Sequence, residues 1–385
     1  MYNIKLLNKI ASCGTDLFDA KYNVGENVEK ASAIMVRSAS MHEMEFEPEL
    51  CAIARAGAGV NNIPLDVCAE KGIVVFNTPG ANANAVKELA ICALLLSSRK
   101  ITAGVEWAKT LEGNEDVAKA VEKGKGQFVG PELKGKKLGV IGLGAIGVMV
   151  ANTAAHLGMT VYGYDPYLTV DAAWNLSRSI VKANELKTIY ENCDYISVHV
   201  PSTPETKGMF NKETYSMMKD GVRIINLSRA DLFNTSDTLD AVKSGKIATY
   251  VTDFPTAETI NVDNIIAIPH LGASTPESED NCAVMAAEEL IDFLENGNIR
   301  NSVNYPTVIL PRSTDKRICI LHKNIPSMVS QITTVLAEDK VNIENMQNKS
   351  KKEYAYTMIE VNGDVADKII ADISAIEGVI KAFVK

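Results

Sequence analysis

The chain has 385 residues, of which 46% are hydrophobic and 23% charged, and its formal net charge is −9. This composition is typical of a soluble globular protein of two or three domains, and the negative charge disfavours nucleic acid or an anionic membrane as the main partner. No long apolar run predicts a membrane span, and the first residues indicate a β-strand and not a secretion signal. The seven cysteines are scattered without a Cys-x-x-Cys pair, which predicts free thiols in a reducing cytoplasm and no bound metal.

Short runs rich in valine and isoleucine alternate with helix-length segments over most of the chain. The predicted strands are 4–7, 33–36, 72–76, 138–141, 160–164, 195–200 and 223–227. Parallel strands covered on both faces have this pattern, which predicts an α/β fold with two doubly wound parallel-sheet domains. Two long predicted helices, 83–109 and 276–295, indicate that the chain crosses twice between these domains. We therefore expect one discontinuous domain of residues 1–98 and 285–305 and a second domain of residues 99–284.

The C-terminal part has a different pattern. Residues 306–314 contain two prolines and few helix formers, and they are predicted to be a linker. Residues 315–385 then give the order strand, helix, strand, strand, helix, strand. This βαββαβ order predicts a small ferredoxin-like domain.

A glycine-rich loop follows the predicted strand at 138–141. The loop reads Gly142-Leu-Gly-Ala-Ile-Gly147 and opens a helix. Its glycines suit a tight turn, a close approach of the backbone to a pyrophosphate, and close packing of the helix on the strand. Asp165 ends the next strand, where a carboxylate binds the ribose hydroxyls of NAD and repels a 2′-phosphate. The domain of residues 99–284 is therefore predicted to be a Rossmann domain that binds NAD. Its predicted cofactor contacts are Gly142, Gly144, Ala145, Ile146, Gly147 and Asp165.

Three polar side chains follow later strands of the same predicted sheet. They are Arg229, Glu258 and His270, each coming after an apolar run. The carboxyl ends of parallel strands meet at one edge of a sheet, so we expect these side chains to share one crevice. Small residues follow His270 and leave room there for a cofactor and a substrate.

Seven segments occur in the order of one enzyme family: 55–63, 77–88, the glycine loop, 197–206, 226–229, 253–258 and 269–275. Over nearly its whole length the chain resembles the D-isomer-specific 2-hydroxyacid dehydrogenases. The resemblance implies that Arg229 binds the substrate carboxylate and polarises the C2 oxygen. It also implies that His270 exchanges the C2 hydroxyl proton and that Glu258 orients the imidazole. The further cofactor contacts that it implies are His199, Pro201, Ser228, Asp253 and Gly272.

The first domain offers a set of candidate substrate contacts. Arg37 and Arg55 end predicted strands and are candidates for a phosphate group on C3. The backbone N–H groups of Gly57, Ala58 and Gly59 are candidates for the substrate carboxylate. Other candidates are Ser38, Asn82 and Asn84, with Lys123 and Lys125 the nearest match to a basic residue that related enzymes supply from a partner subunit. The resemblance thus implies NAD-dependent oxidation of D-3-phosphoglycerate to 3-phosphohydroxypyruvate, the first step of phosphorylated serine biosynthesis.

Residues 315–385 resemble the ACT domain, a small-molecule sensor that pairs edge to edge with a second copy. The resemblance implies serine as an effector, bound by His322, Asn324 and Asn342, and a homodimer or homotetramer. Ser327 stands where the motif usually has glycine, and its side chain is expected to crowd the ligand carboxylate. A module that serves only oligomerisation is the alternative.

Two other functions stay open from the sequence. One is a dehydrogenase of another D-2-hydroxy acid, such as 2-hydroxyglutarate, glycerate or 4-phosphoerythronate. The other is a non-catalytic NAD sensor, as in the transcriptional corepressors that resemble these enzymes. The ACT-like domain and the absence of basic or low-complexity segments favour a metabolic enzyme.

Overall fold

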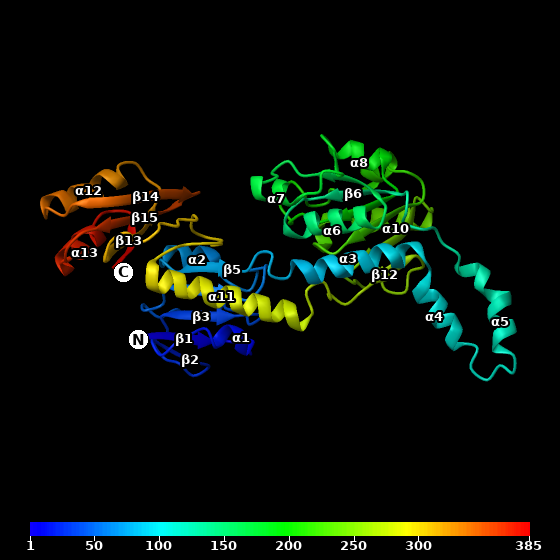
Figure 1. The fold of residues 1–385 in the computed structure, drawn as a ribbon, viewed down its shortest axis with the longest axis horizontal. Helices are drawn as coiled ribbons and strands as arrows, with labels where there is room; N and C mark the ends of the chain where they lie inside the picture. The colour runs from blue at the N-terminus through cyan, green and yellow to red at the C-terminus, as the bar shows by residue number, and fades with distance from the viewer. The chain divides into compact units, whose positions relative to one another are not determined.

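The computed structural model describes all 385 residues, which form two compact units (Figure 1). One unit consists of residues 1–82 and 276–385, and the other of residues 83–275. We expected the chain to pass from one domain to the other after residue 98 and to return after residue 284. The boundaries between the two units instead follow residues 82 and 275, where two long helices begin. None of the helices is both long enough and apolar enough to cross a membrane.

The first unit contains a five-stranded parallel sheet with the strand order β2-β1-β3-β4-β5. Its strands are β1 (Tyr2–Leu6), β2 (Tyr22–Gly25), β3 (Ala33–Val36), β4 (Ala52–Arg55) and β5 (Val74–Asn77). Its helices are α1 (Ser12–Thr15), α2 (Leu65–Glu70) and α11 (Pro276–Asn296), and α11 packs along β3, β4 and β5. The register pairs Val36 with Arg55 and Arg55 with Asn77, so the chain leaves these three strands at one edge of the sheet.

The second unit contains a seven-stranded parallel sheet with the order β12-β11-β10-β9-β6-β7-β8. Its strands are β6 (Lys137–Ile141), β7 (Thr160–Tyr164), β8 (Val181–Lys182), β9 (Tyr195–Val198), β10 (Val222–Asn226), β11 (Ile247–Thr252) and β12 (Ile265–Ala267). The strand order reverses beside β6, which pairs with both β7 and β9. Ligands of doubly wound sheets bind at the carboxyl ends of the strands at such a switch point.

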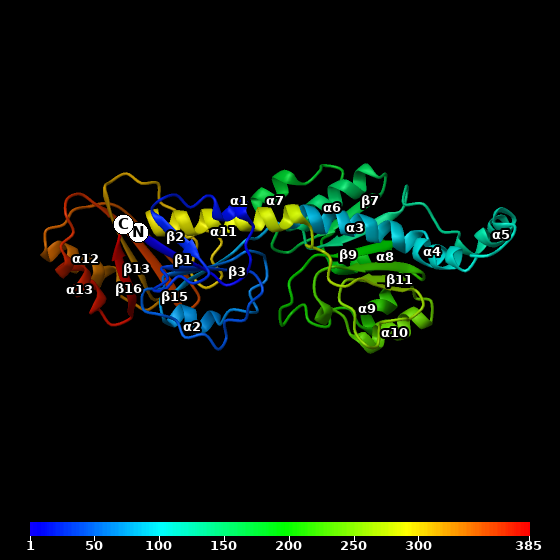
Figure 2. The same cartoon turned by 90° about the horizontal axis from the view of Figure 1, so that it is seen from below.

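Helices cover both faces of this sheet (Figure 2). They are α3 (Ala83–Ser98), α6 (Ala145–His156) and α7 (Val170–Asn175) around one hydrophobic core, and α8 (Leu186–Asn192), α9 (Lys212–Met217), α10 (Thr235–Lys243) and the 3₁₀ turn η2 (Ala230–Leu232) around the other. The predicted helix 83–109 is in fact two helices, because the chain turns at Arg99 and Lys100 before α4 (Ile101–Lys109). Together with α5 (Val117–Gly124) and η1 (Lys125–Phe128), α4 extends away from the sheet and buries none of its residues.

The C-terminal residues form an antiparallel sheet with the order β14-β15-β13-β16. Its elements are β13 (Lys316–Lys323), α12 (Met328–Glu338), β14 (Ile343–Lys351), β15 (Tyr354–Val361), α13 (Asp367–Ser374) and β16 (Val379–Val384). The predicted βαββαβ order is confirmed, and both predicted parallel sheets are also present.

Alternate residues of β13 face two different hydrophobic cores. Ile318 and Ile320 pack against α12 and α13, whereas Cys319 and Leu321 join the core beneath the five-stranded sheet and α11. This alternation is the period-2 geometry of a strand with both faces buried. The C-terminal domain and the five-stranded domain therefore share one hydrophobic core.

Polar contacts reinforce this shared core. The Tyr356 hydroxyl donates to the carbonyl of Gly297 over 2.7 Å. Arg317 and Glu360 form a fully buried ion pair, with 2.6 Å between Nη2 and Oε1, and Arg317 Nη1 also donates to the carbonyl of Asn296. A buried charge needs such partners, because desolvation without them is very costly.

The segment expected to be a linker, 306–314, is packed against the protein. Val308 pairs with Ile299 in an isolated antiparallel bridge, and Leu310 and Val308 belong to the shared core. Its prolines prevent a helix, but its apolar residues hold it in place.

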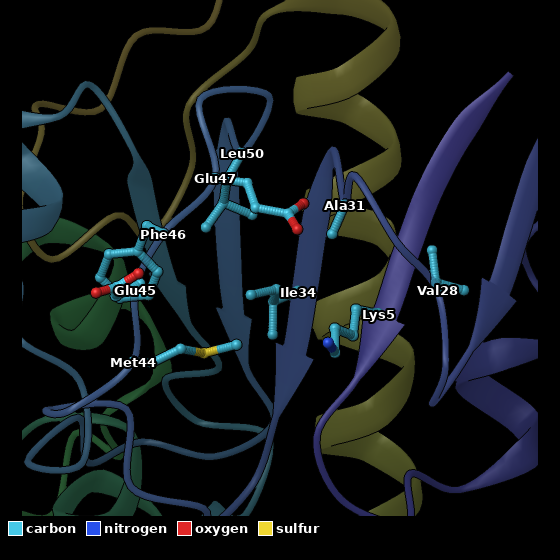
Figure 3. A pocket seen from close by; sticks show the side chains of 9 residues that line it. All are labelled: Lys5, Val28, Ala31, Ile34, Met44, Glu45, Phe46, Glu47 and Leu50. Atoms are coloured by element: carbon cyan, nitrogen blue, oxygen red, sulfur yellow. The ribbon is translucent and has the colours of Figure 1, made fainter.

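A small cavity of about 110 Å³ lies against the five-stranded sheet (Figure 3). Apolar side chains, including Ile34 and Leu50, line it together with Lys5, Glu45 and Glu47. No residue expected to bind cofactor or substrate lines this cavity, so it is separate from the candidate site.

Helix α11 carries a buried carboxyl group at Glu289, which is 5% exposed. Its Oε1 accepts a hydrogen bond from Asn301 Nδ2 over 2.7 Å, while Oε2 has no partner. Burial raises the pKa of Glu289 to about 8. The folded state thus keeps a proton that the unfolded chain releases near pH 4.

Replacing Glu289 by glutamine is expected to remove a pH dependence of stability. The contribution of Glu289 to wild-type stability should be greatest below about pH 4 and should be lost as the pH rises toward 8, by on the order of 1.4 kcal/mol for each pH unit. The Glu289→Gln variant should lack this loss, so its advantage should grow between pH 5 and pH 8. Urea unfolding at several pH values would measure it, with Glu288→Gln as the control on the exposed side of the helix. Parallel curves for wild type and Glu289→Gln would contradict the burial argument.

Candidate active site

The glycine loop has the backbone geometry that its sequence predicts. Gly142 adopts φ +90°, and a Cβ atom there would lie 2.4 Å from the carbonyl oxygen of His199. A Cβ atom on Gly147 would lie 1.9 Å from the carbonyl oxygen of Gly142. Gly144, in contrast, has open space around its missing Cβ. The loop is therefore tight on two sides and open on the side where a pyrophosphate can approach.

Helix α6 begins directly behind this loop, with Gly144 as its N-cap residue. The first turn of a helix has backbone N–H groups without intrahelical partners and a partial positive charge, so Ala145, Ile146 and Gly147 can bind an anion. This donor set fits the pyrophosphate of NAD.

Asp165 is held in position by two backbone N–H groups. Its Oδ2 accepts from Leu143 in the glycine loop, and its Oδ1 accepts from Tyr167, both over 2.8 Å. The carboxylate is thus fixed beside the loop at the end of β7. A fixed carboxylate at this place suits the ribose hydroxyls of NAD and opposes a 2′-phosphate.

Two residues at the ends of β9 and β10 lie near the same loop. His199 Nε2 hydrogen-bonds the Ser197 hydroxyl over 2.8 Å, while His199 Nδ1 is buried without a partner. Burial lowers the pKa of His199 to about 4, so its ring is neutral. Ser228 is also buried, and its hydroxyl donates to the carbonyl of Val198 over 2.6 Å. Pro201 is exposed just beyond β9.

Asp253 connects the end of β11 to the segment that contains His270. Its Oδ2 accepts from the Gly272 N–H over 3.2 Å, and its carbonyl accepts from the His270 N–H over 3.0 Å. Its Oδ1 is buried and has no partner. Burial raises the pKa of Asp253, although the nearby charges of His270 and Arg229 oppose this shift. Asp253 is thus a buried acceptor with one oxygen free for a polar group of the cofactor.

His270 has a left-handed backbone conformation, with φ +48°. Its exposed ring packs on Phe254, with 5.1 Å between the ring centroids. Two backbone bonds to Asp253 and Ile268 hold the turn in which it lies. Non-glycine residues with positive φ are uncommon and cluster at functional sites.

The structure brings Arg229 and His270 close to Asp253 but leaves Glu258 apart. Arg229 is exposed, and its Nη1 donates to the carbonyl of Ser228 over 2.6 Å. Glu258 is exposed as well, and a hydrogen bond with Thr256 lowers its pKa. No contact joins Glu258 to the imidazole of His270 in this conformation.

In the first unit, Arg55 and the loop after it form a second group of predicted residues. Arg55 Nε donates to the carbonyl of Arg37 over 3.1 Å. Gly57 has φ +147°, and a Cβ atom on it would lie 1.5 Å from Arg55 Nη1. The guanidinium group therefore lies directly over this glycine.

Arg37 and Ser38 follow β3 at the same edge of the sheet. The backbone N–H groups of Arg37, Ser38 and Ala39 all donate to Asn8 Oδ1, over 3.0 to 3.1 Å. The Arg37 guanidinium pairs with Glu279 in the first turn of α11. Sequence reasoning missed Asn8 and Glu279, because nothing local marks their contacts with Arg37, from which they lie 29 and 242 positions away along the chain.

The two predicted asparagines lie in different units. Asn82 ends the segment after β5 in the first unit, and Asn84 lies in the first turn of α3 in the second. Asn84 Nδ2 donates to Glu88 Oε1 over 3.0 Å. Lys123 is on α5, and Lys125 pairs with Glu122 over 2.5 Å.

The three predicted effector residues differ in exposure. His322 is buried, and its ring nitrogens are within 2.8 Å of the Lys323 carbonyl and the Thr357 hydroxyl. Asn324 Nδ2 donates to the carbonyl of Lys352, and Asn342 Nδ2 donates to Glu344 Oε1. Both asparagines are exposed, whereas burial lowers the pKa of His322.

Ser327 occupies a backbone conformation that glycine adopts more easily. It is the N-cap of α12 with φ +65°, and its side chain makes no capping hydrogen bond. Ser327→Gly is therefore expected to stabilise the protein by about 1 kcal/mol. Urea unfolding would measure this gain, and Ser330→Gly inside α12 should instead destabilise. A loss of stability in Ser327→Gly would mean that the serine side chain makes a favourable contact.

Comparisons with known proteins agree with this geometry. Residues 92–272 match the model of the D-isomer specific 2-hydroxyacid dehydrogenase, NAD binding domain, and residues 318–381 match an AHAS small subunit-like ACT domain. The chain is 34% identical over 349 residues to D-3-phosphoglycerate dehydrogenase of Escherichia coli (strain K12), covering 87% of this chain and 81% of the relative. It is also 34% identical over 294 residues to the enzyme of that name from Archaeoglobus fulgidus, covering 73% of this chain and 53% of that one.

Solved structures show the same likeness. The NAD⁺-bound 3-phosphoglycerate dehydrogenase of Entamoeba histolytica matches with a TM-score of 0.60 and 27% identity, over 79% of this chain and 98% of that chain. D-mandelate dehydrogenase of Rhodotorula graminis shares the fold, with a TM-score of 0.69 and 23% identity over 81% of this chain and 99% of that chain.

The chain therefore belongs to the D-isomer specific 2-hydroxyacid dehydrogenase family and is an NAD-dependent oxidoreductase. Within that family, the relatives that it matches over most of its length carry the name D-3-phosphoglycerate dehydrogenase.

Proposed function

We propose that this protein oxidises D-3-phosphoglycerate to 3-phosphohydroxypyruvate with NAD, as the first step of phosphorylated serine biosynthesis. The main support for this proposal is the pair of arginines at the ends of β3 and β4. A hydrogen bond from Arg55 Nε to the Arg37 carbonyl joins the two residues. The Gly57 N–H is bonded to the Arg55 carbonyl, but the N–H groups of Ala58 and Gly59 have no backbone partner. Two guanidinium groups beside these two N–H groups suit a substrate that has a phosphate and a carboxylate. The names of the relatives support the same substrate.

The residues of the second unit supply the chemistry in this proposal. NAD bound in this site would supply the acceptor for the hydride of C2. His270 takes the proton of the C2 hydroxyl on its imidazole and returns it in the reverse direction. Arg229 binds the substrate carboxylate and polarises the C2 oxygen, once its guanidinium leaves the Ser228 carbonyl.

Glu258 supports the imidazolium after its side chain leaves Thr256. A carboxylate beside the ring favours the charged form, which is the form that proton transfer produces. Asp253 and the neutral His199 hold the cofactor through their unpartnered atoms, Oδ1 and Nδ1.

The test is an absorbance assay of NADH with purified protein. Phosphoglycerate, 2-hydroxyglutarate, glycerate and 4-phosphoerythronate would be compared, each at equal ionic strength. The reverse reaction with 3-phosphohydroxypyruvate would be measured beside them. Preference for phosphoglycerate supports the proposal, and turnover of another acid alone would reassign the substrate. Bound NADH with no turnover in either direction would point to an NAD sensor.

Arg55→Ala is expected to lower kcat/KM for phosphoglycerate by roughly ten- to a hundredfold. Hydrogen bonds to a charged partner contribute about 1.5–3 kcal/mol, and alanine removes the whole guanidinium. Arg55→Lys should be intermediate, because an ammonium keeps the charge but not the paired donors. Equal losses with phosphoglycerate and with glycerate would show that Arg55 does not recognise the phosphate.

We also propose that the protein forms a homodimer or homotetramer and responds to serine. The extension of α4 and α5 exposes Ile101, Val105 and Val117, apolar side chains that a second copy can cover. Asn324 and Asn342 are accessible to an amino acid, with His322 positioning the segment from within. Light scattering gives the oligomer, and a serine titration of the NADH assay tests the effector. A monomer, or full activity at millimolar serine, would contradict these two proposals respectively.

A cytoplasmic location is proposed on the cysteines. All seven have free thiols in the structure, which suits a reducing compartment.

A further inference from the structure

The guanidinium of Arg37 already has an anionic partner within the protein. Its Nη2 donates to Glu279 Oε1 over 2.5 Å, and both side chains are 44% exposed. Glu279 lies in the first turn of α11, at the end of the helix that faces the carboxyl edge of the five-stranded sheet. The Glu279 carboxylate is thus already paired with one of the two arginines that are proposed to bind the substrate phosphate.

The rest of Arg37 is fixed. Its N–H donates to Asn8 Oδ1, and its carbonyl accepts from Arg55 Nε. Only the side chain is free to exchange partners, and Glu279 is the only acid within ion-pair distance of it. A phosphate that binds Arg37 must therefore compete with this carboxylate.

We propose that Glu279 is a specificity-determining residue that opposes the binding of a dianionic phosphate group at Arg37. This inference rests on the proposed function, since it assigns Arg37 to the phosphate. Before substrate binds, the Glu279 carboxylate holds the Arg37 guanidinium in place. When substrate binds, the same carboxylate repels the phosphate group of the substrate. Substrates without a charge on C3 do not meet this repulsion.

Losing the ion pair between Arg37 and Glu279 and repelling the phosphate have different effects on the binding free energy. An exposed ion pair contributes little, so exchanging Glu279 for a phosphate at Arg37 is easy. Repulsion between the displaced carboxylate and a dianion a few ångströms away is larger, although water and salt reduce it. The net effect on affinity for a phosphorylated substrate is expected to be roughly three- to tenfold.

The experiment compares wild type, Glu279→Gln and Glu277→Gln. Glutamine keeps the size of Glu279 and removes its charge. Glu277 is in the same first turn of α11, is exposed and forms no ion pair. Its variant therefore controls for charge near the helix N-terminus, which acts on any anion. KM and kcat would be measured for phosphoglycerate and for glycerate at low and at physiological salt.

Glu279→Gln should lower KM for phosphoglycerate about three- to tenfold, with kcat and the KM for glycerate unchanged. The difference should shrink at higher salt, and Glu277→Gln should resemble wild type. An unchanged or raised KM in Glu279→Gln would overturn the proposal, as would equal shifts in both variants. If wild type does not oxidise phosphoglycerate at all, the proposed function fails separately. In that case, activity gained in Glu279→Gln supports the role of Glu279, and continued silence rejects it.

Discussion

The His270→Asn variant is expected to lose activity by roughly 10²- to 10⁴-fold in kcat, with NADH binding and stability unchanged. The expected loss follows from the absence of a group that can exchange the C2 hydroxyl proton. Asparagine is the suitable replacement because His270 has φ +48°, a conformation that asparagine adopts readily. The backbone bonds to Asp253 and Ile268 should therefore survive.

Steady-state kinetics and NADH fluorescence titration would measure this variant. His42→Asn is the matched control, because His42 is exposed and only contacts the Asn61 carbonyl. Its activity should equal that of wild type. If His270→Asn kept more than about a tenth of the wild-type kcat, the imidazole would not be the proton-transfer group.

Two glycines of the nucleotide loop should respond differently to alanine. Gly142→Ala forces a Cβ atom to within 2.4 Å of the His199 carbonyl oxygen at φ +90°, so backbone must move. Strain and overpacking together should destabilise the protein by about 2–6 kcal/mol and abolish NADH binding. Urea unfolding without cofactor and NADH titration would measure the two effects.

Gly144→Ala separates cofactor binding from folding. The space around the missing Cβ of Gly144 is open, and φ is −74°, so stability without cofactor should change by less than about 1 kcal/mol. NADH affinity should still fall at least about tenfold, because the methyl group takes the space that a pyrophosphate needs. Wild-type NADH affinity in Gly144→Ala would mean that the pyrophosphate does not pass over this residue.

Much of the fold was predictable because its signals are local. Buried parallel strands appear as short apolar runs, and the glycine loop is specified by a turn that excludes side chains at Gly142. The break between α3 and α4 was not predictable in this way, because the residues around Arg99 continue the helical pattern.

The candidate site was predictable at strand ends and not beyond them. Arg55 ends β4 and Asp165 follows β7, and parallel topology places such residues at the carboxyl edge of each sheet. The pairing of Arg37 with Glu279 joins residues 242 positions apart, and no periodicity encodes it. The same holds for Glu258, whose rotamer depends on its half-buried neighbour Thr256 and not on the motif that contains it.

The hydrophobic core that the ACT domain shares with the five-stranded domain limits how regulation can evolve in this chain. Cys319, Leu321 and Met358 fill one core with Phe293 of α11, the helix that also carries Glu279. The ACT domain therefore cannot be removed without cost. Truncation of the chain before β13 would expose a hydrophobic surface on the domain proposed to bind substrate. A variant that no longer responds to an effector is therefore expected to arise by single substitutions of exposed residues of the ACT domain and not by loss of the whole domain.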